Sequence, residues 1–384
     1  MLYIIAVAGA LLAANTLSLA IAGWRIRSRQ DKTPSVTARP TVSIVIPLCG
    51  VEQFSRETLE SALSLDWPDY EIIFCVADKA DPVIRLAEEA RRVKPLTKAT
   101  VLVGDDRVSA NPKLNNCVKG WNAASHEWVV LADSNVLMPK DYLARLIAAW
   151  RPESGLVCST PLGSRPTGFW AEVECAFLNT HQARWQYAGE ALGFGFAQGK
   201  SMLWRKKTLN SHGGIQALGA EIAEDAAATK LVNRMGLKVH LVGGPFEQPL
   251  GRRTFREIWA RQCRWARLRR VTFPHFFAPE ILLGVVPPLS LCVCAAFVVR
   301  ASLSTTTVAV LCAAYIPELL LAARKNWHLS PISLVAMVTR DILLPAIWIR
   351  SWLAGSFDWR GNRMVIGSHE SRLEAGVAEP IASP

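Results

Sequence analysis

The residues best suited to chemistry are an acidic pair, Glu224 and Asp225, and an arginine-rich stretch that follows them. That stretch, from Gly251 to Arg270, holds eight arginines and includes Arg261-Gln262-Cys263-Arg264-Trp265. A carboxylate can remove a proton from an attacking hydroxyl group, and a guanidinium can stabilise a departing diphosphate. Each half also has a plain structural explanation, because acidic residues complement a helix start and basic runs face solvent or membrane.

Alternating strands and helices are predicted upstream of this stretch, and they must position its partners. The pattern predicts strands at 41–47, 70–76, 100–103 and 127–132, and helices at 54–65, 81–92 and 112–124. All-apolar strands alternating with helices are typical of a parallel sheet covered on both faces. Ligands bind at the carboxyl ends of such strands, and Asp78 and Asp133 lie at two of these ends.

Two further motifs in this region offer groups for binding phosphate or metal. Asp133-Ser134-Asn135 supplies hard oxygen ligands for a cation that phosphates also hold, although a strand-end Asp is equally well explained as a turn cap. Lys113 opens a predicted helix and could reach a phosphate near the helix N-terminus. The sequence contains neither a G-x-G-x-x-G motif nor a P-loop, so it supports neither of those nucleotide sites.

Composition indicates a membrane protein. The chain has 384 residues, of which 51% are hydrophobic, and a formal net charge of +11. Residues 1–24 carry no charge and are long enough to span a bilayer, and a basic segment follows at 25–40. The positive-inside rule therefore predicts a cytosolic domain after the first span. We expect the arginines to face anionic lipid headgroups, so a bilayer and not a nucleic acid is the predicted partner.

Cysteine usage and the C-terminal hydropathy complete this view. The nine cysteines form no C-x-x-C pair, which favours reduced thiols over a disulfide or zinc framework. Segments 281–299 and 301–323 read as membrane spans. Segment 331–355 is interrupted by Arg340, Asp341 and Arg350, and it could span the membrane, re-enter it or lie at its surface.

A helical wheel predicts an amphipathic helix in the arginine-rich stretch. One face gathers apolar residues, namely Phe255, Ile258, Trp259, Cys263 and Ala266. Such a helix could lie in the headgroup plane, and the alternative is that its apolar face packs on the catalytic domain. The predicted organisation is a span at 1–24, a linker at 25–40, a catalytic domain at 41–250, an interfacial helix at 251–277, a membrane region of two or three helices at 281–355 and a flexible tail at 368–384.

Together these motifs resemble membrane-bound inverting glycosyltransferases of the family-2/21 type, and most of all the bacterial ceramide glucosyltransferase group. The resemblance runs from Thr41 to about Gly367. Its residues are Asp78 in Phe-Cys-Val-Ala-Asp, Asp133 in Asp-Ser-Asn, Asp225 in Ala-Glu-Asp, and Arg261, Arg264 and Trp265 in Arg-x-x-Arg-Trp. The segments 47–51, 65–70 and 111–116 are also similar to segments of that group.

The resemblance implies a fold, a donor and a role for each residue. It implies a glycosyltransferase A fold with a mostly parallel Rossmann-like sheet, a UDP-sugar donor, and Mg²⁺ or Mn²⁺ near Asp133 and the diphosphate. Asp78 and Lys113 would border the nucleotide, and Asp225 would be the general base. Arg261, Arg264 and Trp265 would hold donor and acceptor. Asn135 stands where many relatives carry a second Asp, which leaves the metal geometry open.

The expected reaction is inverting transfer of a hexose, glucose above all, to the primary hydroxyl of a membrane lipid, ceramide above all. The expected location is the inner (cytoplasmic) membrane, with several spans and the catalytic domain in the cytosol. Bacterial relatives leave open the transfer of N-acetylglucosamine or another sugar to a hopanoid lipid. A processive polysaccharide synthase would need a translocation pore, for which three or four spans are few. A non-catalytic scaffold would have no reason to keep three aspartates and the arginine motif together.

Overall fold

The computed structural model describes residues 2–27, 36–353, 356–359 and 362–365. Its centre is a seven-stranded sheet in the order β3-β2-β1-β4-β7-β5-β8. The central strands are buried on both faces because they are runs of apolar residues, and every residue of β2 is buried. The strands of this sheet are β1 (Val42–Leu48), β2 (Tyr70–Val76), β3 (Lys98–Val103), β4 (Trp128–Ala132), β5 (Ser154–Ser159), β7 (Ser201–Arg205) and β8 (Lys238–Leu241).

One strand of this sheet breaks its parallel order. β7 lies antiparallel between β4 and β5, whereas all other neighbours run parallel. The chain therefore leaves β2 after Val76 and β4 after Ala132 at the same edge of the sheet. β7 begins at that edge, because Ser201 pairs with Ala132. The predicted mostly parallel α/β sheet is confirmed, and the antiparallel strand is an addition to it.

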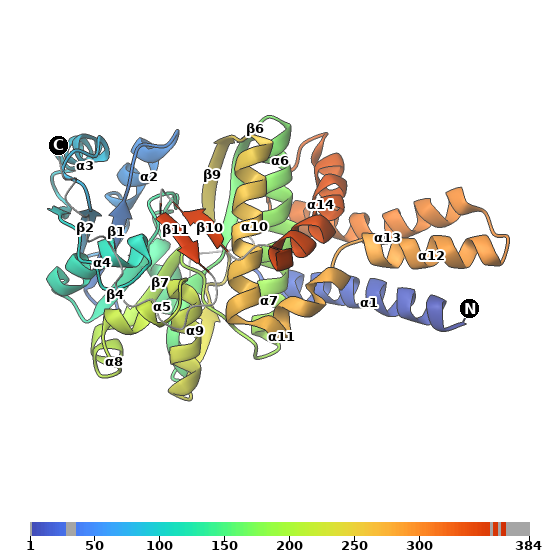
Figure 1. Cartoon of the computed structure of the whole chain (residues 1–384). Helices are drawn as coiled ribbons and strands as arrows, with labels where there is room; N and C mark the ends of the chain where they lie inside the picture. Colours follow the sequence, from blue (N-terminus) through green and yellow to red (C-terminus); the bar gives the residue numbers. More distant parts are fainter. Residues whose placement is uncertain (1, 28–35, 354–355, 360–361, 366–384) are drawn as a thin grey trace, which may run out of the picture.

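Helices cover both faces of the sheet and enclose two hydrophobic cores (Figure 1). α4, α7 and α9 contribute to one core, and α2, α3 and α5 to the other. The helices predicted at 54–65, 81–92 and 112–124 correspond to α2, α3 and α4. The helices on the sheet are α2 (Ser55–Ala62), α3 (Val83–Val93), α4 (Pro112–Ala123), α5 (Tyr142–Ala148), α8 (Lys206–Asn210) and α9 (Glu224–Arg234), with the 3₁₀ segment η2 (Ile215–Ala220).

A long helix connects the sheet to the C-terminal part of the chain. In it α6, the π-helical segment η1 and α7 follow one another without a break, and α10 and α14 pack beside α6 (Figure 1). Two small strand pairs complete this part, β6 with β9 and β10 with β11. The bounds are β6 (Pro161–Thr167), α6 (Phe169–Ala176), η1 (Phe177–Ala183), α7 (Arg184–Ala191), β9 (Phe246–Arg252), α10 (Phe255–Thr272), α14 (Ser333–Leu353), β10 (Ser356–Trp359) and β11 (Asn362–Val365).

The apolar face of α10 contacts protein. The helix begins with a capping box in which Thr254 and Glu257 satisfy each other's backbone N–H groups. Ile258, Cys263 and Ala266 are buried in a cluster with residues of α6 and α14. This differs from the expectation that the face lies in the headgroup plane, because α14 supplies the apolar partner that the wheel could not show. Where α10 lies relative to the bilayer stays a prediction.

Three helices in the described part of the chain are long and apolar enough to cross a membrane. They cover Leu2–Arg25, Pro274–Val298 and Leu303–Arg324. Their main parts, α1, α12 and α13, lie side by side and project from one end of the molecule, with the N-terminus at the far tip (Figure 1). The bounds are α1 (Leu2–Arg25), α11 (Pro274–Phe277), η3 (Ala278–Leu282), α12 (Val286–Val298) and α13 (Leu303–Arg324).

These helices expose the surface that a bilayer would cover. Large apolar side chains such as Leu17, Phe297 and Val308 are exposed on them. The sequence left open whether the segment that forms α14 spans the membrane, re-enters it or lies at its surface. Among the described residues, α14 is not one of the candidate spans. The predicted flexible tail at 368–384 lies outside the described residues.

The basic residues at the C-terminal end of α1 contact α7 and the segment around β8. Arg25 Nε lies 2.7 Å from Glu190 Oε2, and Arg25 Nη2 donates a 2.8 Å hydrogen bond to the Leu241 carbonyl. The N–H of Arg27 donates to the Gly243 carbonyl at 2.6 Å. The sequence assigned these arginines to lipid headgroups, whereas the structure shows that Arg25 pairs with protein, so it fixes the first helix to the sheet.

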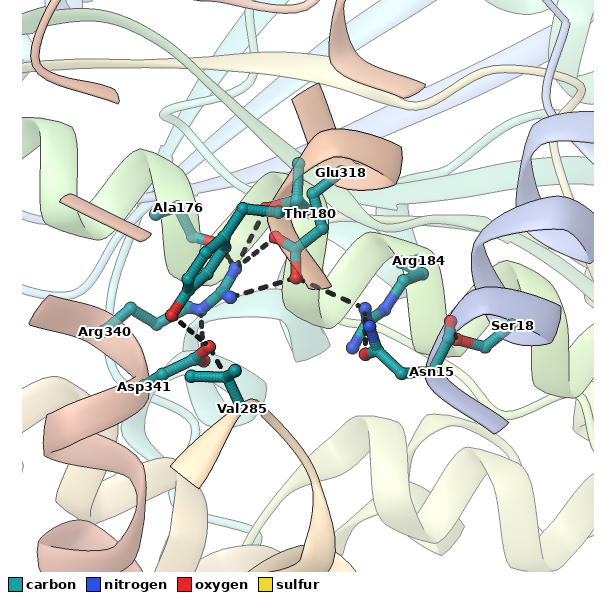
Figure 2. A network of polar contacts seen from close by, with 10 residues as sticks. Asn15, Ser18, Ala176, Thr180, Arg184, Val285, Glu318, Arg340 and Asp341 are labelled. Carbon is teal, nitrogen blue, oxygen red and sulfur yellow. Dashed lines mark hydrogen bonds and ion pairs between the residues drawn. The ribbon is translucent and has the colours of Figure 1, made fainter. Parts of the chain in front are cut away.

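A buried charge network joins α1, α13 and α14 to the long helix (Figure 2). Arg340 of α14 makes a bidentate pair with Glu318 of α13, with distances of 2.9 and 3.1 Å. Arg184 of α7 lies 3.4 Å from Glu318 and donates a 2.7 Å hydrogen bond to Asn15 Oδ1 of α1. Both arginines are fully buried. The network therefore ties four helices together through charged groups that are out of contact with water.

The other side of Arg340 is satisfied as well. Its Nε donates to Asp341 Oδ1 at 2.9 Å, and its Nη1 donates to Thr180 Oγ1 at 2.9 Å. Tyr315 donates a 2.9 Å hydrogen bond to the second oxygen of Asp341. A buried ion pair of this kind is costly to break, since removing one partner leaves an uncompensated charge.

Replacing Arg340 should therefore destabilise the whole protein. We expect Arg340→Met to lower the free energy of unfolding by about 3–5 kcal/mol, because Glu318 and Asp341 lose their shared cation. Thermal unfolding of the detergent-purified protein measures this effect. Arg324→Met, at an exposed position that ends α13, is the matched control and should leave the melting temperature unchanged. Equal melting temperatures for the two variants would contradict a stabilising role.

Candidate active site

The centre of the candidate site is the ammonium group of Lys113, in the first turn of α4. Its Nζ lies 2.6 Å from Asp133 Oδ1 and 2.5 Å from Glu224 Oε1, and it donates a 2.7 Å hydrogen bond to the Gly199 carbonyl. A Cβ on Gly199 would lie 2.6 Å from Glu224 and 2.8 Å from Lys113, so the close approach requires glycine. Lys113 is thus contacted by three segments of the chain. One follows β4, one is the start of α9, and one precedes β7.

The local sequence around α4 positions this lysine. Asn111 caps the helix, its side-chain oxygen accepting hydrogen bonds from the N–H groups of Lys113 and Leu114, and Pro112 occupies the first turn, where no N–H is needed. The amide of Asn111 donates a 2.7 Å hydrogen bond to Glu224 Oε2. Both carboxylate oxygens of Glu224 are therefore engaged, which makes Glu224 a poor acceptor for a substrate proton.

Asp225 has a different environment from its neighbour. Its Oδ2 accepts a 3.2 Å hydrogen bond from the Gly199 N–H, and its Oδ1 accepts a 2.8 Å hydrogen bond from the Ala226 N–H. Burial raises the pKa of Asp225 to about 7, and the negative charge of Glu224 adds to the rise. A carboxyl group with a pKa near neutrality suits general-base catalysis.

Sequence reasoning missed the segment Gly199-Lys200, immediately before β7. The ammonium of Lys200 lies 2.8 Å from Asp133 Oδ2 and 3.0 Å from Asn135 Oδ1. The backbones also meet, since the Asp133 N–H donates a 3.0 Å hydrogen bond to the Lys200 carbonyl. No local motif marks this segment, because its place depends on β7 being inserted antiparallel beside β4.

The contacts favour the ionised forms of Asp133 and Lys113. Burial by itself would raise the pKa of Asp133, but the charges of Lys113 and Lys200 outweigh it and hold the pKa below its usual range. Burial would lower the pKa of Lys113, but Asp133 and Glu224 outweigh it and raise that pKa. Two carboxylates and two ammonium groups therefore balance one another in a region with little exposure to water.

The site offers limited but suitable ligands for a divalent cation. No group of three His, Cys, Asp or Glu side chains that could hold a metal is present in the described part of the chain. Asp133 Oδ2 and Asn135 Oδ1 are nevertheless both directed at one position, where the Lys200 ammonium lies. Two hard oxygens fit the part of a Mg²⁺ or Mn²⁺ site that a protein supplies when phosphates and water supply the rest.

The first arginine of the predicted motif is held by α6. Arg261 pairs with Glu174, a fully buried carboxylate, and Arg253 Nε lies 3.6 Å from the other Glu174 oxygen. Burial lowers the pKa of Lys200, and the positive charge of Arg261 contributes to the lowering. Arg261 therefore lies within electrostatic range of the lysine cluster.

The other two residues of the motif lie on the same helix. Trp265 packs against a small buried cluster that includes Leu178 and Leu250. Arg264 follows Arg261 by three positions, almost one turn later on α10, and so lies near the same side of the helix. Their predicted roles in holding donor and acceptor stay predictions.

Asp78 lies apart from the cluster. It is exposed in the turn after β2, where its Oδ1 accepts a 2.9 Å hydrogen bond from the Ala80 N–H. The described part of the chain shows no contact between Asp78 and Lys113 or Asp133, because β1 separates β2 from β4. Asp78 shares the carboxyl edge of the sheet with the cluster, and its predicted role at the nucleotide stays a prediction.

A pocket adjoins the cation position. It opens between the start of α2, the segment after β4 and the end of β9. Its lining residues are Glu52, Gln53, Phe54, Ser55, Thr58, Ser134, Asn135, Pro249, Leu250 and Arg253. Asn135 thus borders this pocket while it also contacts Lys200, so a bound molecule here would lie beside the charged cluster.

Comparison with known proteins decides the family. The model of glycosyl transferase family 21 matches residues 2–372, nearly the whole chain. The chain belongs to glycosyl transferase family 21. Family 21 membership together with the mostly parallel sheet confirms the predicted glycosyltransferase A fold, and three candidate spans make the protein a membrane-associated glycosyltransferase.

Curated relatives of this family 21 protein are ceramide glucosyltransferases. Ceramide glucosyltransferase 3 of Caenorhabditis elegans is 25% identical over 356 residues, which cover 91% of this chain and 77% of the relative. The ceramide glucosyltransferase of Komagataella phaffii is 37% identical over 112 residues, which cover 28% of this chain and 22% of the relative.

Solved structures similar to this family 21 chain include a mannosyltransferase from Pyrobaculum calidifontis in complex with GDP-Man and Mn²⁺. It is 20% identical with a TM-score of 0.48, and the match covers 91% of this chain and 98% of that one. Glucosyl-3-phosphoglycerate synthase from Mycobacterium tuberculosis, in complex with Mn²⁺, UDP-glucose and phosphoglyceric acid, is 16% identical with a TM-score of 0.40. That match covers 64% of this chain and 87% of the other.

The raised pKa of Asp225 predicts how activity in this family 21 enzyme depends on pH. A general base must be deprotonated, so kcat/KM should increase about tenfold per pH unit below pH 7 and level off above it. Initial rates from pH 5.5 to 8.5, with saturation by each substrate checked at every pH, measure the profile. A flat profile between pH 5.5 and 7.5 would contradict the assignment.

Proposed function

We propose that this protein transfers glucose from UDP-glucose to the primary hydroxyl group of ceramide and inverts the configuration at the anomeric carbon. The observation that carries the proposal is that two adjacent acids, Glu224 and Asp225, have different environments. Glu224 is held by Lys113 and Asn111, whereas Asp225 has a pKa of about 7 and stands beside the same cationic cluster. The similarity to curated ceramide glucosyltransferases supports the choice of glucose and ceramide.

The donor diphosphate would bind over the lysine cluster. Lys113 and Lys200 offer positive charge at the carboxyl edge of the sheet, where α/β folds bind nucleotides. Asp78, on the same edge, would border the nucleotide. Arg261 and Arg264, the latter followed by Trp265, would contact donor and acceptor from α10 in the proposed arrangement.

The reaction follows from the position of the base. Asp225 removes the proton from the lipid hydroxyl, whose oxygen forms a bond to the anomeric carbon from the face opposite UDP. The bond between that carbon and the diphosphate oxygen breaks, and UDP leaves with the electron pair. A single displacement inverts the centre and gives a β-glycoside, with no covalent enzyme intermediate. Asp133 and Asn135 would hold a divalent cation, which would supply further positive charge for the leaving diphosphate.

The membrane helices would bring the lipid to this site. The catalytic domain lies at the end of α1 and α13 where Arg25, Arg324 and Lys325 are found. The positive-inside rule therefore supports a catalytic domain on the cytosolic side, in the inner (cytoplasmic) membrane. A soluble UDP-sugar and an insoluble acceptor would then meet at the membrane surface.

A transfer assay with defined substrates tests the proposed function. Purified protein in nanodiscs receives UDP-glucose or UDP-N-acetylglucosamine, each with ceramide or with a hydroxylated hopanoid, and mass spectrometry identifies the product. We expect glucosylceramide from one combination only. Asp225→Asn should lower its rate by about 10² or more because the base is lost. Asp69→Asn, an exposed position in the same domain, is the control and should retain the rate.

Two outcomes of this assay would contradict the proposal. A product formed only with the hopanoid would reject ceramide as the acceptor. A rate close to that of the unaltered protein in Asp225→Asn would reject Asp225 as the base, even if glucosylceramide were the product.

Dependence on metal is a separate prediction. Among the described residues, Asp133 supplies the one carboxylate directed at the cation position, so Mg²⁺ or Mn²⁺ should bind tightly only together with the UDP-sugar. We expect excess chelator to abolish transfer, and added Mg²⁺ or Mn²⁺ to restore it. Calorimetry of metal binding with and without UDP measures the coupling directly. Full activity in excess chelator would contradict a metal role.

A further inference from the structure

The Lys200 ammonium occupies a position with the geometry of a bound cation. Its Nζ lies between Asp133 Oδ2 at 2.8 Å and Asn135 Oδ1 at 3.0 Å, the two oxygens that suit a divalent ion. The Lys200 side chain is only 13% exposed, so the ammonium is confined there and does not move freely in water. Any metal that uses both oxygens must first displace this group.

The two lysines of the cluster differ in how fully they are engaged. An ammonium group has three N–H donors. Within the described residues, Lys113 uses all three, on Asp133, Glu224 and the Gly199 carbonyl. Lys200 uses two there, on Asp133 and Asn135, which leaves its third donor without a partner among these residues. Lys200 is thus the better placed of the two to contact an incoming phosphate oxygen.

The balance of charge limits what can enter the site. Asp133 and Glu224 are matched by Lys113 and Lys200. A divalent cation alone would add unbalanced positive charge beside two ammonium groups. A sugar nucleotide carries one negative charge on each of its two phosphates, which equals the charge of a divalent cation. The pair therefore enters without disturbing the balance, whereas either partner alone disturbs it.

We propose that Lys200 is a resident cation that fills the position between Asp133 and Asn135 until donor and metal arrive together, and that its ammonium then contacts the donor diphosphate. The inference deepens the proposed function and rests on it for the identity of the donor. In this proposal Lys200 has two roles: it keeps free metal out of the site, and it helps to bind the diphosphate. Removing its charge should consequently change the two affinities in opposite directions.

The test measures two binding constants in Lys200→Met. Mn²⁺ binding to the protein without nucleotide, followed by electron paramagnetic resonance, should tighten about tenfold or more, because the competing charge is gone. Binding of UDP-glucose in excess chelator, followed by calorimetry, should weaken about tenfold or more, since a cation is lost. Lys200→Arg keeps the charge, so it should retain weak Mn²⁺ binding and recover much of the UDP-glucose affinity.

Lys207→Met is the matched control. Lys207 is exposed on α8, so its replacement should leave the Mn²⁺ and UDP-glucose binding constants unchanged. Unaltered Mn²⁺ affinity in Lys200→Met would overturn the resident cation, and unaltered UDP-glucose affinity in chelator would overturn the diphosphate contact. Melting temperatures of all variants verify that each one is folded. If the unaltered protein binds no UDP-glucose, the proposed function is rejected. The Mn²⁺ measurement contains no donor, so it still tests the role of Lys200 in that case.

Discussion

The pairing of buried charge at Lys113 is the constraint on which the site depends. A charged group removed from water is tolerated only when partners surround it, and here Asp133 and Glu224 supply them. Those partners come from the end of β4 and the start of α9, so the pairing holds only when the sheet and its helices are assembled. Gly199 completes the arrangement because any larger residue would push the charges apart. Folding and the assembly of the site are therefore the same event.

Two neighbouring acids acquire different chemistry from that constraint. Glu224 compensates the lysine and is hydrogen bonded by Asn111, so it serves the structure. Asp225 is also partly buried, and in the described part of the chain its carboxylate accepts hydrogen bonds from backbone N–H groups. Burial, and then the charge of Glu224, disfavour its ionised form. A raised pKa therefore distinguishes Asp225 as the candidate base from the acid beside it. Lys200 extends this logic, since it balances Asp133 on the other side.

A single long helix links this chemistry to the membrane. Near its start Glu174 holds Arg261 of α10, and farther along Thr180 and Arg184 join the buried network around Arg340 (Figure 2). The same long helix therefore contacts the arginine motif, the candidate spans α1 and α13, and α14. A lipid acceptor that reaches the site would do so beside a structure held at both ends by buried ion pairs.

The sequence by itself determined the parallel strands, the helices over them, the candidate spans and the family, because each depends on apolar periodicity or on short motifs. Lys113, Asp133 and Asp225 could be named from local pattern for the same reason. Lys200, the engagement of Glu224 and the burial of the α10 face could not. They depend on β7 lying antiparallel beside β4, and on α14 covering α10. Only tertiary packing decides such contacts, since they join residues far apart in the chain that carry no local signal of each other.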